Sequence, residues 1–192
     1  MKKKAIFLDR DGTINVDKDY MYKTEDFEFV EGVIEGLQIL SKLGYIFIVV
    51  TNQAGIARGY YKENDVENLH KYLYDYLKTL GIKIDKFYYC PHHPEKGIGK
   101  YRIDCDCRKP KTGMFKKAFE EFEVDKENSF MVGDNISDIE AGLNSNLKAI
   151  LVKTGHGYEH EEKALKMKNV EVYDSLIEFA NHLKNEIRSK KY

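Results

Sequence analysis

The chain has 192 residues, of which 42% are hydrophobic and 33% charged, a composition typical of one globular domain with a full core. Its 31 basic and 32 acidic residues leave a net charge of −1, which argues against binding to nucleic acid or to an anionic membrane surface. No apolar stretch is long enough to cross a membrane, so we expect a cytoplasmic location. From its length we expect a single domain over residues 1–192, and we expect it to be a monomer.

The first hydrophobic run, residues 5–8, predicts a buried central strand that ends in Asp9-Arg10-Asp11-Gly12. In an open α/β sheet, ligands bind beyond the carboxyl ends of the strands, where Asp9 and Asp11 would lie. Two close carboxylates repel each other unless a cation lies between them, and carboxylate oxygens suit Mg²⁺. A carboxylate can also be a nucleophile that forms an aspartyl phosphate. The alternative is a pair of turn-forming aspartates without chemistry.

Residues 13–30 are polar and aromatic without a clear period, and they predict a loop long enough to fold over a ligand. Apolar residues at helical spacing predict a helix over residues 31–43. A second buried strand over residues 45–50 ends in Thr51, whose hydroxyl can hydrogen-bond a phosphate oxygen. Taken alone, a threonine at such a position is more often a helix cap or a turn residue than a phosphate ligand.

Two Cys/His pairs follow a tyrosine-rich helix over residues 62–80 and a strand over residues 82–89. The pairs are Cys90 with His92 and Cys105 with Cys107, and His93 is the alternative to His92. Three thiolates and one imidazole suit a tetrahedral structural Zn²⁺. We therefore expect zinc to staple an inserted loop over residues 90–107. The alternative is three reduced cysteines that have no common role.

Arg108 and Lys109 follow the cysteine pair directly, so the zinc loop would fix the direction of two cations and favour an anion site. A helix over residues 114–122 and a strand over residues 129–132 come next. That strand ends in Gly133-Asp134-Asn135-Ile136-Ser137-Asp138, which places further carboxylates near the first pair. We expect Asp134 to complete a Mg²⁺ site and Asp138 to cap a helix over residues 138–145.

The remaining elements are a strand over residues 148–152, a strand over residues 170–172 and a helix from Ser175 with a capping box to Glu178. We expect His156 and His160, in the polar stretch between them, to be solvated. Alternation of strands and helices predicts an α/β fold: a Rossmann-like, doubly wound, mainly parallel sheet with helices on both faces. The zinc loop would form a minimal cap over the strand ends.

Four motifs, in this order on successive strand ends, resemble those of the haloacid dehalogenase superfamily of phosphohydrolases. They are Asp9-Arg10-Asp11-Gly12-Thr13, Thr51-Asn52-Gln53, Arg108-Lys109 and Gly133-Asp134-Asn135-Ile136-Ser137-Asp138. The four predicted zinc ligands narrow the resemblance to a branch of this superfamily that acts on sugar bisphosphates or on histidinol phosphate. Residues 7–15, 50–59 and 88–94 resemble the sugar bisphosphate members more closely. Asn135 departs from the pattern, since members often have a basic residue there.

The resemblance implies that Asp9 is the nucleophile and that Asp11 acts first as general acid and then as general base. It implies a catalytic Mg²⁺ held by Asp9, the backbone carbonyl of Asp11 and Asp134, with Thr51 and Lys109 stabilising the phosphoryl group. It also implies a structural Zn²⁺ and a small sugar bisphosphate as substrate. The substrate-binding residues would be Asp17, Lys18, Asp19, Tyr20, Asn52, Gln53, Ala54, Arg108 and Asn135.

Three alternatives remain open from the sequence. The first is a histidinol-phosphate phosphatase with the same chemistry. The second is a phosphatase of nucleic-acid ends, which the near-neutral charge disfavours. The third is a zinc-stabilised binding module without catalysis, which would leave the joint presence of Asp9, Asp11, Thr51, Lys109 and Asp134 unexplained.

Overall fold

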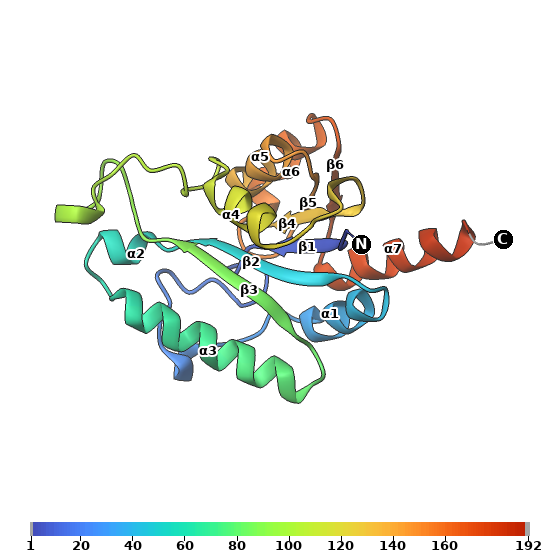
Figure 1. Cartoon of the computed structure of the whole chain (residues 1–192), viewed down its shortest axis with the longest axis horizontal. Helices are drawn as coiled ribbons and strands as arrows, with labels where there is room; N and C mark the ends of the chain where they lie inside the picture. Colours follow the sequence, from blue (N-terminus) through green and yellow to red (C-terminus); the bar gives the residue numbers. More distant parts are fainter. Residues whose placement is uncertain (1, 191–192) are drawn as a thin grey trace.

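A computed structural model describes residues 2–190 and shows one six-stranded sheet in which all neighbouring strands are parallel (Figure 1). The strand order is β3-β2-β1-β4-β5-β6, so the first strand lies in the middle. The strands are β1 (Ala5–Leu8), β2 (Ile46–Asn52), β3 (Ile84–Cys90), β4 (Phe130–Gly133), β5 (Lys148–Val152) and β6 (Val170–Tyr173). The doubly wound parallel sheet predicted from the sequence is confirmed.

Helices cover both faces of the sheet, with α1, α3 and α7 on one side and α4, α5 and α6 on the other (Figure 1). A short helix, α2, follows β2 directly. The helices are α1 (Val33–Lys42), α2 (Ala54–Ala57), α3 (Glu63–Thr79), α4 (Gly113–Glu121), α5 (Ile136–Asn144), α6 (Gly157–Leu165) and α7 (Leu176–Ser189). Three short 3₁₀ turns lie at Thr24–Asp26, Gly99–Tyr101 and Lys126–Asn128.

Strand β1 shows why its sequence is continuously apolar. All four of its residues are fully buried, because successive side chains point to opposite faces and both faces carry helices. Ile6 and Leu8 pack in the core beneath α1, α3 and α7, whereas Ala5 and Phe7 pack beneath α4 and α5. Phe7 contacts the rings of Phe115 and Phe119 on α4. A strand with two apolar faces belongs in the centre of such a sheet.

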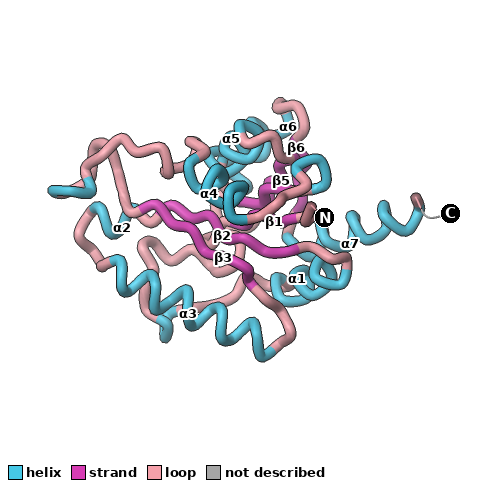
Figure 2. The backbone as a smooth tube through the Cα atoms, in the orientation of Figure 1, coloured by secondary structure: helices cyan, strands magenta, loops and turns pink. Residues whose placement is uncertain are grey.

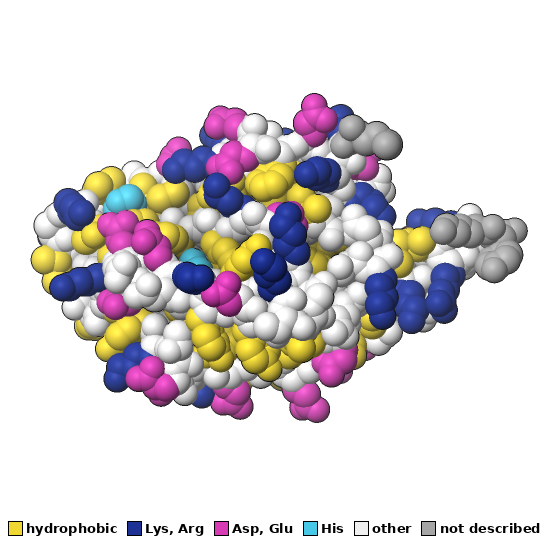
Figure 3. Space-filling view, turned by 60° about the horizontal axis from the view of Figure 1, so that its bottom comes forward, with side chains coloured by type: hydrophobic (Ala, Val, Ile, Leu, Met, Phe, Trp, Pro, Cys, Tyr) yellow, Lys and Arg dark blue, Asp and Glu magenta, His cyan; other side chains and the backbone are white. Residues whose placement is uncertain are grey.

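All six strands run the same way, so their carboxyl ends meet at one edge. The stretch between β3 and α4 extends past that edge as a long loop with one 3₁₀ turn, on the left of Figure 2. Cys90 is the last residue of β3, and this loop contains the other three predicted zinc ligands, His92, Cys105 and Cys107. Basic and acidic side chains are interspersed over most of the face in Figure 3, as expected for a near-neutral chain. No helix within residues 2–190 is long and apolar enough to span a membrane.

Three helices differ from the sequence expectation: α5 begins earlier than predicted, and α2 and α6 lie where no helix was predicted. Helix α5 begins two residues before the predicted start, because Asn135 is its N-cap and accepts a hydrogen bond from the Ser137 backbone N–H. Asp138 is the third residue of that helix and accepts from the Asn135 N–H, so both residues share a capping box. Helix α6 occupies a stretch for which no helix was predicted.

Candidate active site

The carboxyl ends of β1 and β4 bring three aspartates together around one lysine. Carboxylate oxygens of Asp9, Asp134 and Asp138 lie within 4.8 Å of one another, and all three side chains are almost fully buried. Lys109 Nζ donates to Asp9 Oδ1 at 2.8 Å and to the Val50 carbonyl at 2.7 Å, and it lies 2.6 Å from Asp138 Oδ1. All three ammonium protons are therefore used inside the protein.

The charges in this group perturb one another strongly. Burial raises the pKa of Asp9 from 3.8 to about 7, with Lys109 opposing the shift and Asp138 adding to it. Burial and the neighbouring carboxylates of Asp9 and Asp138 raise the pKa of Asp134 to about 8. Burial also works against the charge of Lys109, but Asp138 and Asp9 outweigh it and raise the pKa of the lysine. The group holds more negative charge than one lysine neutralises, so a divalent cation fits it.

Glycine allows the close approach of the first loop to Asp134. Gly12 has a φ of 79°, in the left-handed region, and a Cβ there would overlap the carboxylate of Asp134. The Asp134 Oδ2 atom also accepts from the His156 backbone N–H at 2.8 Å. Asp134 is thus held against the loop that carries Asp9 and Asp11, as the placement of these motifs on adjacent strands predicts.

The side chain of Asp11 stands apart from the three clustered carboxylates. It accepts hydrogen bonds from the guanidinium of Arg10, from Asn15 Nδ2 at 3.0 Å and from Gln53 Nε2 at 2.9 Å. Gln53 Nε2 also donates to the Thr51 hydroxyl at 2.9 Å. Thr51 and Gln53 are each 1% exposed, so this part of the site is a buried polar network.

A cavity of about 510 Å³ opens in front of these carboxylates. It is lined by Asp9, Asp11, Asp17, Asp19, Tyr20, Asn52, Gln53, Ala54, Tyr61, Arg108, Lys109, Asp134, Asn135, Ser137, Asp138 and His156. Most of the predicted site residues therefore surround one space. The predicted loop over residues 13–30 supplies Asp17, Asp19 and Tyr20 to its wall.

Two predicted residues lie outside that lining among the described residues. Lys18 turns away, where its Nζ donates to the Asp26 carbonyl and pairs with Glu28 at 2.9 Å. Thr51 lies beneath the wall, in contact with Gln53. Conversely, His156 is half exposed, as the sequence predicted, but it also lines the cavity and faces Asp17 across 3.5 Å. Its place just beyond β5, at the same sheet edge, was the signal that could have located it.

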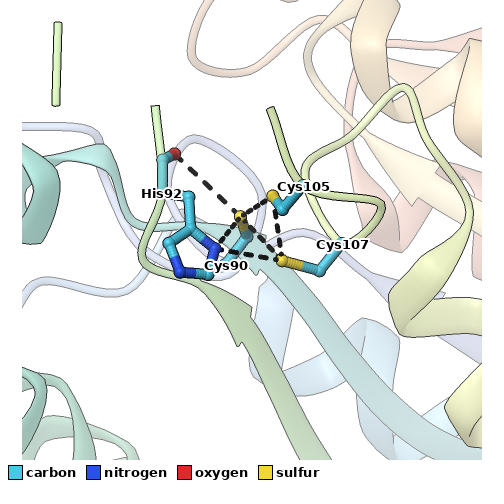
Figure 4. A group of neighbouring side chains, drawn as sticks. All are labelled: Cys90, His92, Cys105 and Cys107. Carbon is cyan, nitrogen blue, oxygen red and sulfur yellow. Dashed lines mark hydrogen bonds between the residues drawn. The ribbon is translucent and has the colours of Figure 1, made fainter. Parts of the chain in front are cut away.

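The four predicted zinc ligands form a second, separate cluster (Figure 4). The Sγ atom of Cys107 lies 3.0 Å from that of Cys90 and 3.2 Å from that of Cys105, and 3.6 Å from His92 Nδ1. The hydrogen bond between Cys107 and Cys90 lowers the pKa of Cys107 to about 5 and raises the pKa of Cys90, so Cys107 is the thiol that more readily forms the thiolate that metals bind. Four such ligand atoms within 4.8 Å of one another suit one tetrahedral ion.

The residues after this cluster are anchored in two ways. Arg108 lines the cavity and donates to the His92 carbonyl at 3.3 Å, so its position depends on the cysteine loop. Lys109 is fixed independently, because its N–H donates to Asn52 Oδ1 at 3.0 Å and its carbonyl accepts from Asn52 Nδ2 at 3.2 Å. Asn52, predicted as a substrate contact, therefore also joins β2 to the lysine.

The buried pair between Lys109 and Asp138 gives a stability prediction. Their side chains are 1% and 2% exposed, so Asp138→Asn removes a charge that water cannot replace. Asp9, the other carboxylate beside Lys109, replaces it only in part, because burial raises the pKa of Asp9 to about 7. We expect urea denaturation to show a loss of about 3 kcal/mol, the lower end for breaking one side of a buried pair. The control is Asp75→Asn, which removes the exposed partner of Lys71 and should leave the midpoint unchanged. Equal midpoints for the two variants would contradict the prediction.

Comparisons with known proteins agree with this geometry. A family model described as "HAD-hyrolase-like" matches residues 106–179. A D-glycero-beta-D-manno-heptose-1,7-bisphosphate 7-phosphatase of Pasteurella multocida is 50% identical over 154 residues, covering 80% of this chain and 83% of that protein. A D-glycero-alpha-D-manno-heptose-1,7-bisphosphate 7-phosphatase of Campylobacter jejuni is 48% identical, covering 79% of this chain and 83% of that protein.

A solved structure matches nearly the whole fold. It is the D,D-heptose 1,7-bisphosphate phosphatase of B. bronchiseptica complexed with magnesium and phosphate, with a TM-score of 0.85 and 28% identity. The match covers 95% of this chain and 99% of that one. With a buried aspartate cluster at the predicted strand ends and half of the aligned residues shared with a curated relative, this chain belongs to the family of the D-glycero-D-manno-heptose-1,7-bisphosphate 7-phosphatases, within the haloacid dehalogenase superfamily.

Proposed function

We propose that this protein removes the C7 phosphate of D-glycero-D-manno-heptose 1,7-bisphosphate and leaves the 1-phosphate. The observation that carries the proposal is the placement of Asp9, which is buried at the end of β1, is paired with Lys109 and lines the cavity. The relatives of this chain named for this reaction support the substrate. The 1-phosphate product would be converted to a nucleotide-activated heptose, for lipopolysaccharide or for a surface-layer glycan.

The reaction would proceed in two transfers. An oxygen of Asp9 attacks the phosphorus, the bond to the C7 oxygen breaks, and that oxygen keeps the electron pair and takes a proton from Asp11. Water then attacks the phosphorus of the aspartyl phosphate while Asp11 accepts its proton, which releases inorganic phosphate and restores Asp9. Thr51 and Lys109 would hold the phosphoryl oxygens during both transfers.

Mg²⁺ would be bound by the carboxylates of Asp9 and Asp134 and by the backbone carbonyl of Asp11, and its charge would offset the anionic phosphoryl group. The raised pKa values of Asp9 and Asp134 support such a site, because both carboxylates need a cation to stay ionised. The magnesium bound in the B. bronchiseptica structure supports the same ion here.

The two raised pKa values predict how stability depends on pH. Protons bound to Asp9 and Asp134 in the folded protein stabilise it fully below their ordinary value of 3.8, and this contribution is lost as the pH rises through about 7 and 8. The metal-free protein should therefore melt at a lower temperature at pH 8 than at pH 6. Mg²⁺ should stabilise more strongly at pH 8, where it competes with fewer protons.

Thermal melts in EDTA and in saturating Mg²⁺ at both pH values would check this, with Asp134→Asn as the control. A Mg²⁺-dependent rise in melting temperature that is the same at both pH values in the unmodified protein would contradict the prediction. The Asp134→Asn variant should lose most of the response, since it lacks one of the two raised carboxylates.

The second cluster would bind a structural Zn²⁺ through Cys90, His92, Cys105 and Cys107. Four protein ligands leave no open position on a tetrahedral ion, so this metal would shape the loop and take no part in the chemistry. Its loop carries Arg108 to the cavity. We propose that Arg108 binds the substrate, together with Asn52, Gln53, Ala54 and the loop over residues 17–20.

The deciding experiment is phosphate release with Mg²⁺ from both anomers of the heptose 1,7-bisphosphate and from histidinol phosphate, assayed side by side. Release of one phosphate from a heptose bisphosphate, with little from histidinol phosphate, would support the proposal and identify the preferred anomer. A preference for histidinol phosphate would overturn the substrate assignment and keep the chemistry. No release from any of the three would overturn the catalytic proposal.

A further inference from the structure

Arg10 is the largest fully buried side chain of the protein, and it lies outside the cavity lining among the described residues. A guanidinium cannot give up its charge in a protein, so complete burial requires partners for its N–H groups. Asp11 is the first of these partners. Nη2 donates to both oxygens of Asp11, at 3.0 and 2.9 Å, and Nε donates to Asp11 Oδ1 at 3.2 Å.

The guanidinium is also held from helix α3, from the loop over residues 13–30 and from Gln53 after β2. Nη1 lies 3.3 Å from Nε2 of His70, and Nη2 donates to the Met21 carbonyl at 3.1 Å and to Gln53 Oε1 at 3.3 Å. Arg10 thus touches four different segments of the chain. Its only charged partner among them is Asp11.

The surroundings of His70 allow it to accept a hydrogen bond from Arg10. It is 5% exposed, and its ring stacks on Phe87 of β3 at 4.6 Å between centroids. Burial and the adjacent Arg10 hold the pKa of His70 well below its ordinary value, so the ring is neutral and Nε2 can accept from the guanidinium. His70 lies outside the cavity lining and has no contact with the carboxylates of the site within the described residues.

Gln53, which lines the cavity, contacts both Arg10 and Asp11. Its Nε2 donates to Asp11 and Thr51, and its Oε1 accepts from Arg10 and from the Tyr61 hydroxyl at 2.7 Å. Both amide protons and both lone pairs are therefore used. Asp11 is fixed from two directions, by Arg10 behind it and by Gln53 beside it.

We propose that Arg10, itself oriented by His70, is a positioning residue that holds the Asp11 carboxyl in the place from which it transfers protons. This inference rests on the proposed function, in which Asp11 protonates the leaving oxygen and then deprotonates water. It also assigns an indirect role in the reaction to His70 on α3, which lies outside the cavity lining. The contact of Arg10 with both oxygens of Asp11 matters because a proton donor must lie within hydrogen-bond distance of the leaving atom.

The test compares two leaving groups, because only one of them needs a proton. An alkoxide such as the sugar oxygen leaves poorly unless it is protonated, whereas 4-nitrophenolate leaves without help. In Arg10→Met we expect turnover of the heptose bisphosphate to fall by about 10²-fold, the lower range for general acid–base catalysis, with KM nearly unchanged. With 4-nitrophenyl phosphate, stopped-flow absorbance should show a burst of one nitrophenolate per enzyme at an unchanged rate, followed by slow turnover.

That pattern separates positioning from a general loss of structure. A distorted site would slow the nitrophenolate burst as much as it slows the sugar phosphate, and this outcome would overturn the inference. Unchanged turnover of both substrates would also overturn it. Arg10→Lys keeps the charge and loses the fork, so it should restore only part of the activity towards the sugar phosphate.

One further variant keeps the inference testable if Arg10→Met does not fold. His70→Leu removes only the outer contact of the guanidinium and should show the same selective loss, smaller in size. Arg188→Met and His182→Leu, on α7, repeat both replacements away from the site and should change the turnover of neither substrate.

If the heptose bisphosphate is not a substrate, the same comparison can be made with glycerol phosphate, which also has an alkyl leaving group. A wrong substrate assignment is thereby distinguished from a wrong role for Arg10. An unmodified protein inactive on every ester would overturn the proposed function and this inference together.

Discussion

Asp9→Asn is expected to lower phosphate release by on the order of 10⁴-fold or more, because an amide cannot replace the attacking carboxylate. Lys109 Nζ would still find an acceptor in the amide oxygen at this position, so the lysine should stay in place. The variant also removes one of the clustered carboxylates that raise the pKa of Asp134. We therefore expect the melting temperature of the metal-free variant to equal or exceed that of the unmodified protein.

Initial rates with the heptose bisphosphate and a thermal melt in EDTA would check both parts of this prediction. The matched control is Asp174→Asn, which makes the same change at an exposed aspartate paired with Lys153. The control should retain full activity. Residual turnover above a few per cent in Asp9→Asn would sink the nucleophile assignment, and a strong loss of stability would show that the aspartate is structural.

Cys107→Ser is expected to lose bound zinc, because a serine hydroxyl does not supply the thiolate that the site needs. Cys107 lies closest to the centre of the cluster, with Cys90, Cys105 and His92 all within 3.6 Å of its Sγ. Metal binding contributes to folding in such sites, so the melting temperature should fall by several degrees. Plasma emission spectrometry of the purified protein would measure the zinc content.

The same variant should affect binding more than chemistry. Arg108 is held by the His92 carbonyl inside the cysteine loop, whereas Lys109 is held by Asn52 of β2. Loss of zinc should therefore raise KM for the sugar bisphosphate while kcat falls less. Asp106→Ser, an exposed residue of the same loop, is the control and should keep one zinc per chain. A full complement of zinc in Cys107→Ser would refute the ligand assignment.

The apolar strands were the most predictable part of the fold. Strands β1 and β5 match the predicted ranges, because a run of buried residues stops abruptly where the chain reaches the polar sheet edge. Helix α6 was missed for the opposite reason. Only Gly157 and Ala164 of its nine residues are buried, so it has no apolar stripe from which a helical period could be read.

The candidate site could also be predicted only in part. Strand ends located Asp9, Asp11, Thr51 and Asp134, since parallel strands bring their carboxyl ends together. Sequence patterns could not predict that Asp138 pairs with Lys109, because that contact depends on how the first turn of α5 lies against the loop before α4. Nor could they predict the contact between Arg10 and His70, which lie 60 positions apart.

The place of β1 in the sheet also bears on how the protein is made. One edge of β1 pairs with β2, but the other pairs with β4, which begins only at Phe130. While the ribosome is still adding the residues between them, the growing chain carries an open edge of purely apolar strand, a template for pairing with other chains. Emergence of β4 closes that edge and delivers Asp134 in the same event. A translation product that stops before β4 would be both inactive and prone to aggregate, so release from chaperones and acquisition of the site should coincide.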